Sequence, residues 1–156
     1  MIKLVRLDER FIHGQVAFAW TNNLGADCIF IVNDEVASDK LRQTSLKLAA
    51  PAGVKFIVKN VEDAKKALLS GKTKKYKIFL IVDNTRDVLE LAKVSSEIKQ
   101  LNLGNMRMME GRKSITNSIC ISDEDIENIK ELEKLGVEVE CRAIPTDKKV
   151  RALDLV

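Results

Sequence analysis

The sequence predicts a three-layer α/β/α fold around an open, mainly parallel sheet of six to seven strands. Short apolar runs alternate with amphipathic stretches at a spacing of roughly 20–27 residues, which is typical of βα units. Most runs are nearly continuous in Val, Ile, Leu and Phe, as strands are when helices cover both faces of a sheet. Because 156 residues fall within the usual range of about 100–200 for one domain, a single domain over residues 1–156 is expected.

Seven segments have the apolar character of strands, and each is bounded by charged or turn-forming residues. In order, the expected strands are Ile2–Leu7, Asp27–Val32, Val54–Val58, Lys77–Val82, Ile98–Leu103, Ser114–Ile121 and Val137–Arg142. Right-handed crossovers through the intervening helices would place consecutive strands in one parallel sheet.

Helices are expected between these strands, near residues 14–24, 38–49, 61–70, 85–94 and 123–135. Three of them follow a capping residue that stands three positions before a carboxylate and can satisfy the free amides of a first turn. These capping residues are Asn60, Asn84 and Ser122. Three helices end before a glycine, where a left-handed residue closes the last turn. These glycines are Gly25, Gly71 and Gly136.

Composition and charge exclude several classes of protein. Apolar residues make up 46% and charged residues 31% of the chain, a balance that supports a folded core rather than disorder. No apolar run approaches the roughly 18–20 residues that span a bilayer, and the amino terminus lacks the apolar region of a secretory signal. The formal charge of +3 is too small to indicate nucleic-acid binding. We therefore expect a cytoplasmic protein with no nucleic-acid partner and no direct membrane insertion.

Two further features have ordinary structural interpretations. The basic segment Gly71–Lys77 lies between an expected helix and an expected strand and is interpreted as a solvated turn. The three cysteines, Cys28, Cys120 and Cys141, lie in or at the end of apolar runs and form no C-x-x-C motif. Buried free thiols explain them better than a disulfide framework or a metal site.

The loop after the first expected strand carries the strongest candidate for chemistry. Open α/β sheets bind ligands at the carboxyl ends of their strands, and this loop holds His13, the only histidine of the chain, followed by Gly14 and a helix. The positive end of a helix favours the neutral, nucleophilic ring, and its free amides form an anion site. Arg10 offers a donor fork for phosphate oxygens, and Asp8 is placed to hold Arg10 or to orient the ring. This arrangement favours phosphoryl transfer through His13.

On chemistry alone, other interpretations of the same residues stay open. A lone histidine near a loop is most often a surface or packing residue, and Asp8 with Arg10 is often no more than a local ion pair. A zinc site is disfavoured because no second His or Cys accompanies His13. Nucleotide-binding motifs do not compete, because there is no G-x-G-x-x-G and the segment Gly104–Ser114 lacks the glycine spacing and the lysine of a phosphate-binding loop.

The segment Leu4–Val16 resembles the D-x-R-x-I-H-G-Q-V signature of the IIB component of the mannose/fructose/sorbose class of the bacterial sugar phosphotransferase system. The resemblance extends over essentially the whole chain. It continues through Trp20 and through residues 31–37, 47–54, 101–107, 122–125 and 136–139. Two departures from the family pattern are Phe11, where Leu is frequent, and Asn33, where an Asp pair is common.

The resemblance implies an enzymatic activity and assigns residues to it. His13 would take a phosphoryl group from a phosphohistidine of the IIA partner, carry it on Nδ1, and pass it to a sugar at the membrane-embedded IIC/IID complex. No cofactor is implied beyond this covalent phosphohistidine intermediate. Arg10 would stabilise the moving phosphoryl group, Asp8 would support the loop, and Gly14 and Gln15 would supply donors. The family fold implies the strand order 3-2-4-1-5-6.

Residues of other loops are weaker candidates for the same site. Asp34, in the loop after the second expected strand, is a supporting candidate, which the departure at Asn33 makes less specific. Asn84 and the segment Asn102–Met106 end strands at the same expected edge of the sheet. Helix capping explains Asn84 equally well.

A carrier of this kind would be docked by two partners in turn, which requires a small and adaptable apolar surface. Phe11, Ile12 and the segment Met106–Met109 fit that need, and the alternative is that they close the core. No segment resembling IIA precedes the first strand, which predicts a separate IIB chain held at the inner face of the membrane through IIC/IID. A homodimer stays open.

Two other functions also stay open. One is a non-catalytic regulatory relative that binds partners, and the other is a small hydrolase that uses the same anion site. The identity of the sugar is not encoded in the features described.

Overall fold

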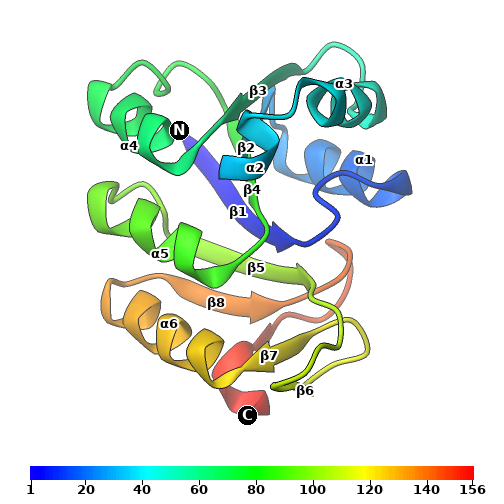
Figure 1. The fold of residues 1–156 in the computed structure, drawn as a ribbon, viewed down its shortest axis with the longest axis vertical. Coiled ribbons are helices and arrows are strands. Elements are labelled where there is room, and N and C mark those ends of the chain that lie inside the picture. Colours follow the sequence, from blue (N-terminus) through cyan, green and yellow to red (C-terminus); the bar gives the residue numbers. More distant parts are fainter.

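The computed structural model describes all residues 1–156 and contains a seven-stranded sheet in the order β3-β2-β4-β1-β5-β8-β9 (Figure 1). All neighbouring strands are parallel except β8 and β9, which pair antiparallel. The strands of this sheet are β1 (Ile2–Asp8), β2 (Cys28–Val32), β3 (Lys55–Lys59), β4 (Ile78–Val82), β5 (Gln100–Asn105), β8 (Glu138–Cys141) and β9 (Val150–Arg151). The order 3-2-4-1-5 of the first five expected strands is therefore confirmed, and the place beside β5 is taken by β8, which corresponds to the seventh expected strand, Val137–Arg142, rather than the sixth.

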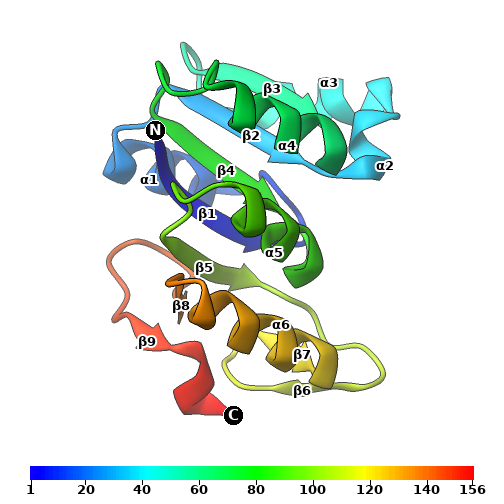
Figure 2. The same ribbon diagram turned by 90° about the vertical axis from the view of Figure 1, so that its left-hand side faces the viewer.

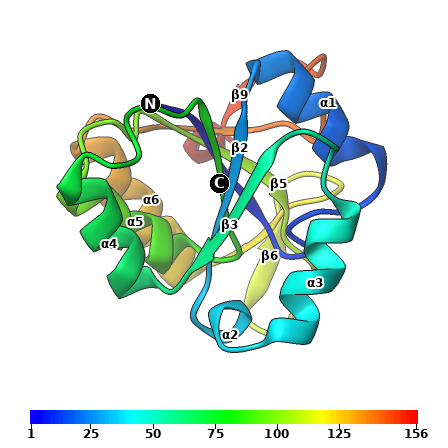
Figure 3. The ribbon, with the colours of Figure 1, turned by 90° about the horizontal axis from the view of Figure 1, so that it is seen from above.

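Helices cover both faces of the sheet and complete the expected three layers (Figures 2 and 3). Helices α4 (Val61–Ser70), α5 (Thr85–Val94) and α6 (Asp123–Lys134) lie on one face. On the other face lie α1 (Gly14–Leu24) and α3 (Lys40–Ala49), with the short α2 (Asp34–Ala37) at the sheet edge, and η1 (Ala152–Leu155) ends the chain.

The strand side chains divide between two hydrophobic cores, one on each face of the sheet. In β4, Leu80 and Val82 join the larger core beneath α4, α5 and α6, whereas Phe79 and Ile81 join the smaller core with α1 and α3. Because successive residues of a strand point to opposite faces, a strand covered on both sides must be apolar at every position. This explains the continuous apolar runs on which the fold class was predicted.

The predicted helix ends are confirmed. The side chains of Asn60, Asn84 and Ser122 each accept a hydrogen bond from the backbone N–H three residues later, at 2.8–3.1 Å. Gly25, Gly71 and Gly136 have positive φ angles of 62°, 78° and 85°. These local signals hold because each capping bond depends only on residues within one helical turn.

One expected strand is wrong. The segment Ser114–Ile121 does not run through the main sheet but turns back on itself between β6 (Arg112–Ser114) and β7 (Cys120–Ser122), which form a separate antiparallel pair. Thr116 accepts a hydrogen bond from the backbone N–H of Ile119, which closes the turn. Polar turn-forming residues at 116–118 interrupt the apolar run, because their side chains compete for backbone hydrogen bonds.

The sheet has protected edges. β3 lies at one edge and carries a lysine at each end, Lys55 and Lys59, whereas β9 at the other edge has only two residues. None of the helices combines the length and the apolar character needed to cross a lipid bilayer.

The three cysteines are free and buried, as expected. Burial raises the pKa of Cys28 to about 11 and that of Cys141 to about 12, so that both remain protonated at neutral pH. Since the thiolate is the reactive form, we predict that Cys28 and Cys141 resist alkylation in the native protein at pH 8 and react readily in denaturant. Peptide mass spectrometry after timed alkylation measures this, and modification of either thiol within minutes under native conditions would contradict it.

Candidate functional site

The candidate site lies at the carboxyl end of β1, near the middle of the sheet. β1 pairs with β4 on one side and with β5 on the other, so that its last residue, Asp8, lies among the carboxyl ends of parallel strands. The chain then turns through residues 9–13 into α1 (Figure 1). This position brings loops from neighbouring strands to the same edge, as the general arrangement of open α/β sheets predicts.

His13 contacts the buried carboxylate of Asp8 through Nε2, at 3.0 Å from Oδ2. The ring is 21% exposed, whereas Asp8 is only 1% exposed. An ionised carboxylate only accepts hydrogen bonds, so this contact places the ring proton on Nε2 and leaves the lone pair on Nδ1. His13 is also the residue that precedes α1, in extended backbone, and its side chain makes no capping bond. The ring is therefore held by one nitrogen and free at the other.

Asp8 is the centre of the site. It accepts hydrogen bonds from the Arg6 guanidinium at 3.1 Å, from the backbone N–H of Arg10 at 2.9 Å and, at 3.4 Å, from the side-chain amide of Asn105. The sequence left open whether Asp8 holds the Arg10 side chain or orients the ring. Asp8 contacts and orients the ring. Its ionic partner is Arg6, two residues earlier on the same face of β1, rather than Arg10.

Arg10 has an exposed side chain without an ion pair or hydrogen bond in the structure. Gly14 and Gln15 are exposed as well, and the first turn of α1 carries no acidic side chain. The first backbone N–H groups of a helix have no partner within it and attract anions. An exposed guanidinium and a free helix end thus lie within three residues of His13 in the chain, and both are suited to phosphate oxygens.

Gly14 has a positive φ of 53° at the point where the loop enters α1, and nothing lies within 4 Å of where a side chain would begin. The requirement for glycine here is therefore conformational rather than steric.

Phe11 and Ile12 belong to the smaller core and are buried. The prediction that they form an exposed docking surface is wrong, and the alternative that they close the core is confirmed. Phe11 adopts a positive φ of 57°, which costs a non-glycine residue about 1 kcal/mol. This conformation turns the ring inward, where the Arg42 guanidinium lies 5.3 Å from its centroid. Met106 is also buried, whereas Met108 and Met109 are exposed.

Two other candidates have local structural roles. Asp34 is exposed and accepts a hydrogen bond from the backbone N–H of Val61 at the start of α4. Asn84 caps α5 through Asp87. Neither side chain forms a contact with His13 or Asp8 among the hydrogen bonds and ion pairs of the structure.

Arg6 and Glu9 are two residues of the site that the sequence pattern did not indicate. Burial lowers the pKa of the Arg6 guanidinium, and the neighbouring Asp8 opposes this shift. Glu9 accepts a hydrogen bond from the backbone N–H of Arg107 at 2.7 Å and forms an ion pair with Arg112 at 2.8 Å. These contacts connect residues 9–13, the histidine loop, to the segment after β5. The sequence signal that could have indicated Arg6 is its charge inside the largely apolar strand β1.

The structure contains no group of three or more His, Cys, Asp or Glu side chains arranged to hold a metal ion.

Comparison with known proteins identifies the family. The sequence profile described as "PTS system sorbose subfamily IIB component" matches residues 2–156. The chain belongs to this family. Among its relatives, the sorbose-specific EIIB component of Klebsiella pneumoniae is 36% identical over 99% of this chain and 94% of its own length. The mannose-specific EIIAB component of Escherichia coli K12 is 35% identical over the whole chain, which spans 48% of that protein.

Solved structures agree with this assignment of a phosphotransferase system IIB component. The IIBSor domain of the sorbose permease from Klebsiella pneumoniae superimposes with a TM-score of 0.94 at 35% identity, covering 99% of this chain and 95% of that one. The N-acetylgalactosamine-specific IIB component 1 from Escherichia coli gives a TM-score of 0.90 at 30% identity, covering 97% and 99%. The fold and the family of phosphotransferase components are thereby established together.

We predict that Asp8→Asn lowers the free energy of unfolding by about 3 kcal/mol, because it leaves the buried Arg6 guanidinium without its counter-charge. Urea unfolding measures the change. Asp154→Asn, which removes a carboxylate from the exposed ion pair with Arg151, is the matched control and should leave the unfolding curve nearly unchanged. Equal stability of the two variants would show that the Asp8 charge does not hold the site together.

Proposed function

We propose that this IIB component carries a phosphoryl group on Nδ1 of His13, taken from a phosphohistidine of a IIA partner and delivered to a sugar at a IIC/IID membrane complex. The observation that carries the proposal is the contact of Nε2 with Asp8 at 3.0 Å, which leaves Nδ1 as the nucleophilic nitrogen. A neutral imidazole held in one tautomer by a carboxylate is a group activated for nucleophilic attack.

Both steps exchange one bond to phosphorus for another. In the first, the Nδ1 lone pair of His13 forms a bond to phosphorus while the bond to the donor imidazole breaks, and the donor nitrogen recovers its electron pair. In the second, a sugar hydroxyl oxygen bonds to phosphorus, the bond to Nδ1 breaks, and the hydroxyl proton leaves to a base or to water at the acceptor. No cofactor takes part, since the phosphohistidine itself is the intermediate.

Arg10 and the first turn of α1 would stabilise the phosphoryl group during both steps. Phosphoryl transfer depends mostly on positioning and on neutralising charge at the non-bridging oxygens. The exposed guanidinium of Arg10 is not engaged elsewhere, and the amides after Gly14 are free for the anion.

Docking of two partners in turn fits the surface near the site. Met108 and Met109 are 59% and 45% exposed and lie in the segment that Glu9 ties to the histidine loop. Flexible thioether side chains repack against different surfaces. A protein that works in this way is cytoplasmic and meets the membrane only through its partners.

The substrate class is inferred from the names of relatives. Those relatives are described as specific for sorbose, mannose, fructose or N-acetylgalactosamine. We infer a sugar of this class for the present chain, with the choice among them made by the membrane partner.

We predict that His13→Gln abolishes phosphorylation by a phosphorylated IIA protein, because no other imidazole exists in the chain. Incubation with the radiolabelled donor measures the transfer, and the product should be labile to acid and stable to alkali. The unchanged protein must retain its label in the absence of a sugar acceptor. Rapid release of inorganic phosphate would instead favour a hydrolase, and absence of any label would favour a non-catalytic regulatory relative.

We predict that Arg10→Gln slows phosphoryl transfer about 100-fold, the usual effect of removing one donor to developing charge, without a change in stability. Rapid-quench measurement of phosphorylation gives the rate. Arg86→Gln, which removes an exposed arginine from α5, is the matched control and should transfer at the original rate. Equal rates for both variants would exclude a role for Arg10.

A further inference from the structure

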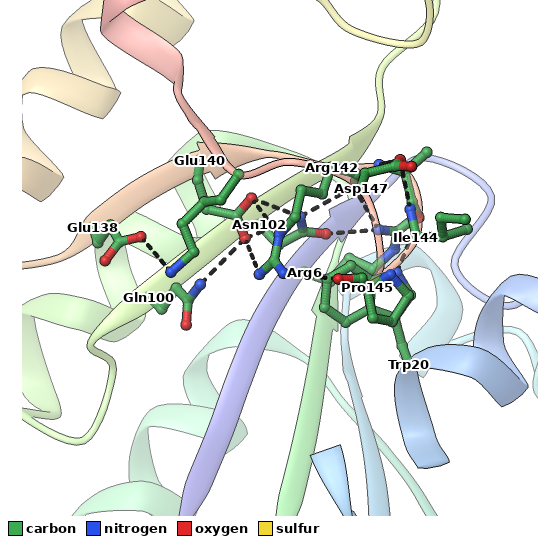
Figure 4. Close-up of polar contacts among 12 residues, drawn as sticks. Arg6, Trp20, Gln100, Asn102, Glu138, Glu140, Arg142, Ile144, Pro145 and Asp147 are labelled. Atoms are coloured by element: carbon green, nitrogen blue, oxygen red, sulfur yellow. Dashed lines mark hydrogen bonds and ion pairs between the residues drawn. The ribbon is translucent and has the colours of Figure 1, made fainter. Parts of the chain in front are cut away.

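A buried polar chain begins at Oδ2 of Asp8, the oxygen that also contacts His13, and crosses three neighbouring strands. Figure 4 shows the part of this chain that runs from Arg6 through Asn102 to Glu140. In β1, the Arg6 guanidinium donates to Asp8 through Nη2 at 3.1 Å and to Oδ1 of Asn102 in β5 through Nη1 at 2.6 Å. Nη1 also lies 3.2 Å from the backbone carbonyl of Arg142, just after β8. Arg6 is only 3% exposed, so that every one of these contacts lies inside the protein.

The chain ends on a buried carboxylate, Glu140 of β8. The side-chain amide of Asn102 donates to both Glu140 oxygens, at 3.2 and 3.3 Å. Arg142 donates to the same carboxylate through Nε at 3.0 Å and Nη2 at 2.8 Å. Asn102 must turn its oxygen to Arg6 and its nitrogen to Glu140, because a guanidinium only donates and a carboxylate only accepts. The direction of every hydrogen bond in the chain is therefore fixed.

Packing holds the Arg6 guanidinium in place from two further sides. The Trp20 ring of α1 lies 5.4 Å from it and 5.0 Å from the Arg142 guanidinium, and its Nε1 donates to the carbonyl of Ala143 (Figure 4). In the neighbouring strand β5, a Cβ added at Gly104 would collide with the guanidinium carbon. Gly104 is thus the residue that leaves space for Arg6.

Stability alone does not explain this arrangement, because a buried ion pair is often no more stabilising than apolar packing of the same volume. Its contacts point to a second role, in positioning the His13 ring. Asp8 is the group that holds the phosphorylatable ring, and Arg6 fixes where its carboxylate points. Arg6 also balances the Asp8 charge. A carboxylate so held accepts the hydrogen bond from Nε2 in a fixed direction, which favours the ring tautomer that has its lone pair on Nδ1.

We propose that Arg6, oriented by Asn102 and Glu140 and accommodated by Gly104, is a positioning residue that fixes the orientation and the tautomer of the His13 ring, so that the lone pair of Nδ1 is aimed for phosphoryl transfer. The proposal rests on the function proposed above and extends it to residues that touch neither phosphate nor sugar.

The test combines transfer kinetics with ¹⁵N NMR of histidine-labelled protein, in which His13 gives the only imidazole signals. Three variants are compared with the unchanged protein: Arg6→Met, Arg6→Lys and Gly104→Ala. The last keeps every polar group and displaces the guanidinium by steric contact. Arg151→Lys is the matched control, because Arg151 pairs with Glu133 and Asp154 at the exposed far edge of the sheet.

We expect transfer to slow about 10- to 100-fold in Arg6→Met and Gly104→Ala, the usual size of an effect on a group that orients a reactive one. Arg6→Lys, which keeps the charge, should recover part of the rate. At pH 8 the unchanged protein and the control should show a protonated Nε2 and an unprotonated Nδ1. Arg6→Met and Gly104→Ala should show a mixture of the two neutral tautomers, with the proton on Nε2 in one and on Nδ1 in the other.

Original rates and ring signals in Arg6→Met and Gly104→Ala would overturn the proposal, and so would slow transfer with unchanged ring signals, which indicates a structural role alone. If Arg6→Met does not fold, Arg6→Lys and Gly104→Ala decide by the same readouts. Failure of the unchanged protein to accept phosphate would contradict the proposed function, whereas the ring signals would still decide whether Arg6 sets the state of His13.

Discussion

The structure of the site depends on one buried carboxylate, Asp8, that is shared between a cation and an imidazole. Desolvating a charge is costly unless other groups pair with it and hydrogen-bond to it. Asp8 meets this requirement by accepting hydrogen bonds from Arg6 and His13 at Oδ2 and from the backbone N–H of Arg10 at Oδ1. The position of the carboxylate at the end of an interior strand fixes all three partners. Asp8 thus holds the histidine loop through buried hydrogen bonds, while the His13 ring remains partly exposed to solvent.

Much of the fold could be predicted because its signals are local or periodic. Continuous apolar runs require cover on both faces of a sheet, and capping at Asn60, Asn84 and Ser122 depends only on the next turn of chain. The run Ser114–Ile121 misled because its apolar composition outweighed three polar turn residues at its centre. The position of His13 at a strand-to-helix loop was equally readable from sequence.

The rest of the site could not be read from sequence because it depends on packing between distant segments. Asp8 forms its ion pair with Arg6 rather than Arg10 because residues two apart on a strand share a face. The Arg10 side chain lies in the loop and is exposed to solvent. Asn102 and Glu140 lie more than 90 residues beyond Arg6 in the chain, and only the strand order β1-β5-β8 brings them together. Phe11 is buried because its left-handed backbone reverses the chain, a conformation that a bulky residue seldom adopts.

The charged edge strand β3 has a consequence for life in a crowded solution. An open sheet presents unsatisfied backbone groups along its border, and a neighbouring chain can add to them and form an aggregate. The lysine at each end of β3 disfavours such pairing by charge repulsion. At the opposite border, β9 has only two residues and offers few backbone groups for pairing. Both borders of the sheet are therefore poor templates for strand addition by a neighbouring chain.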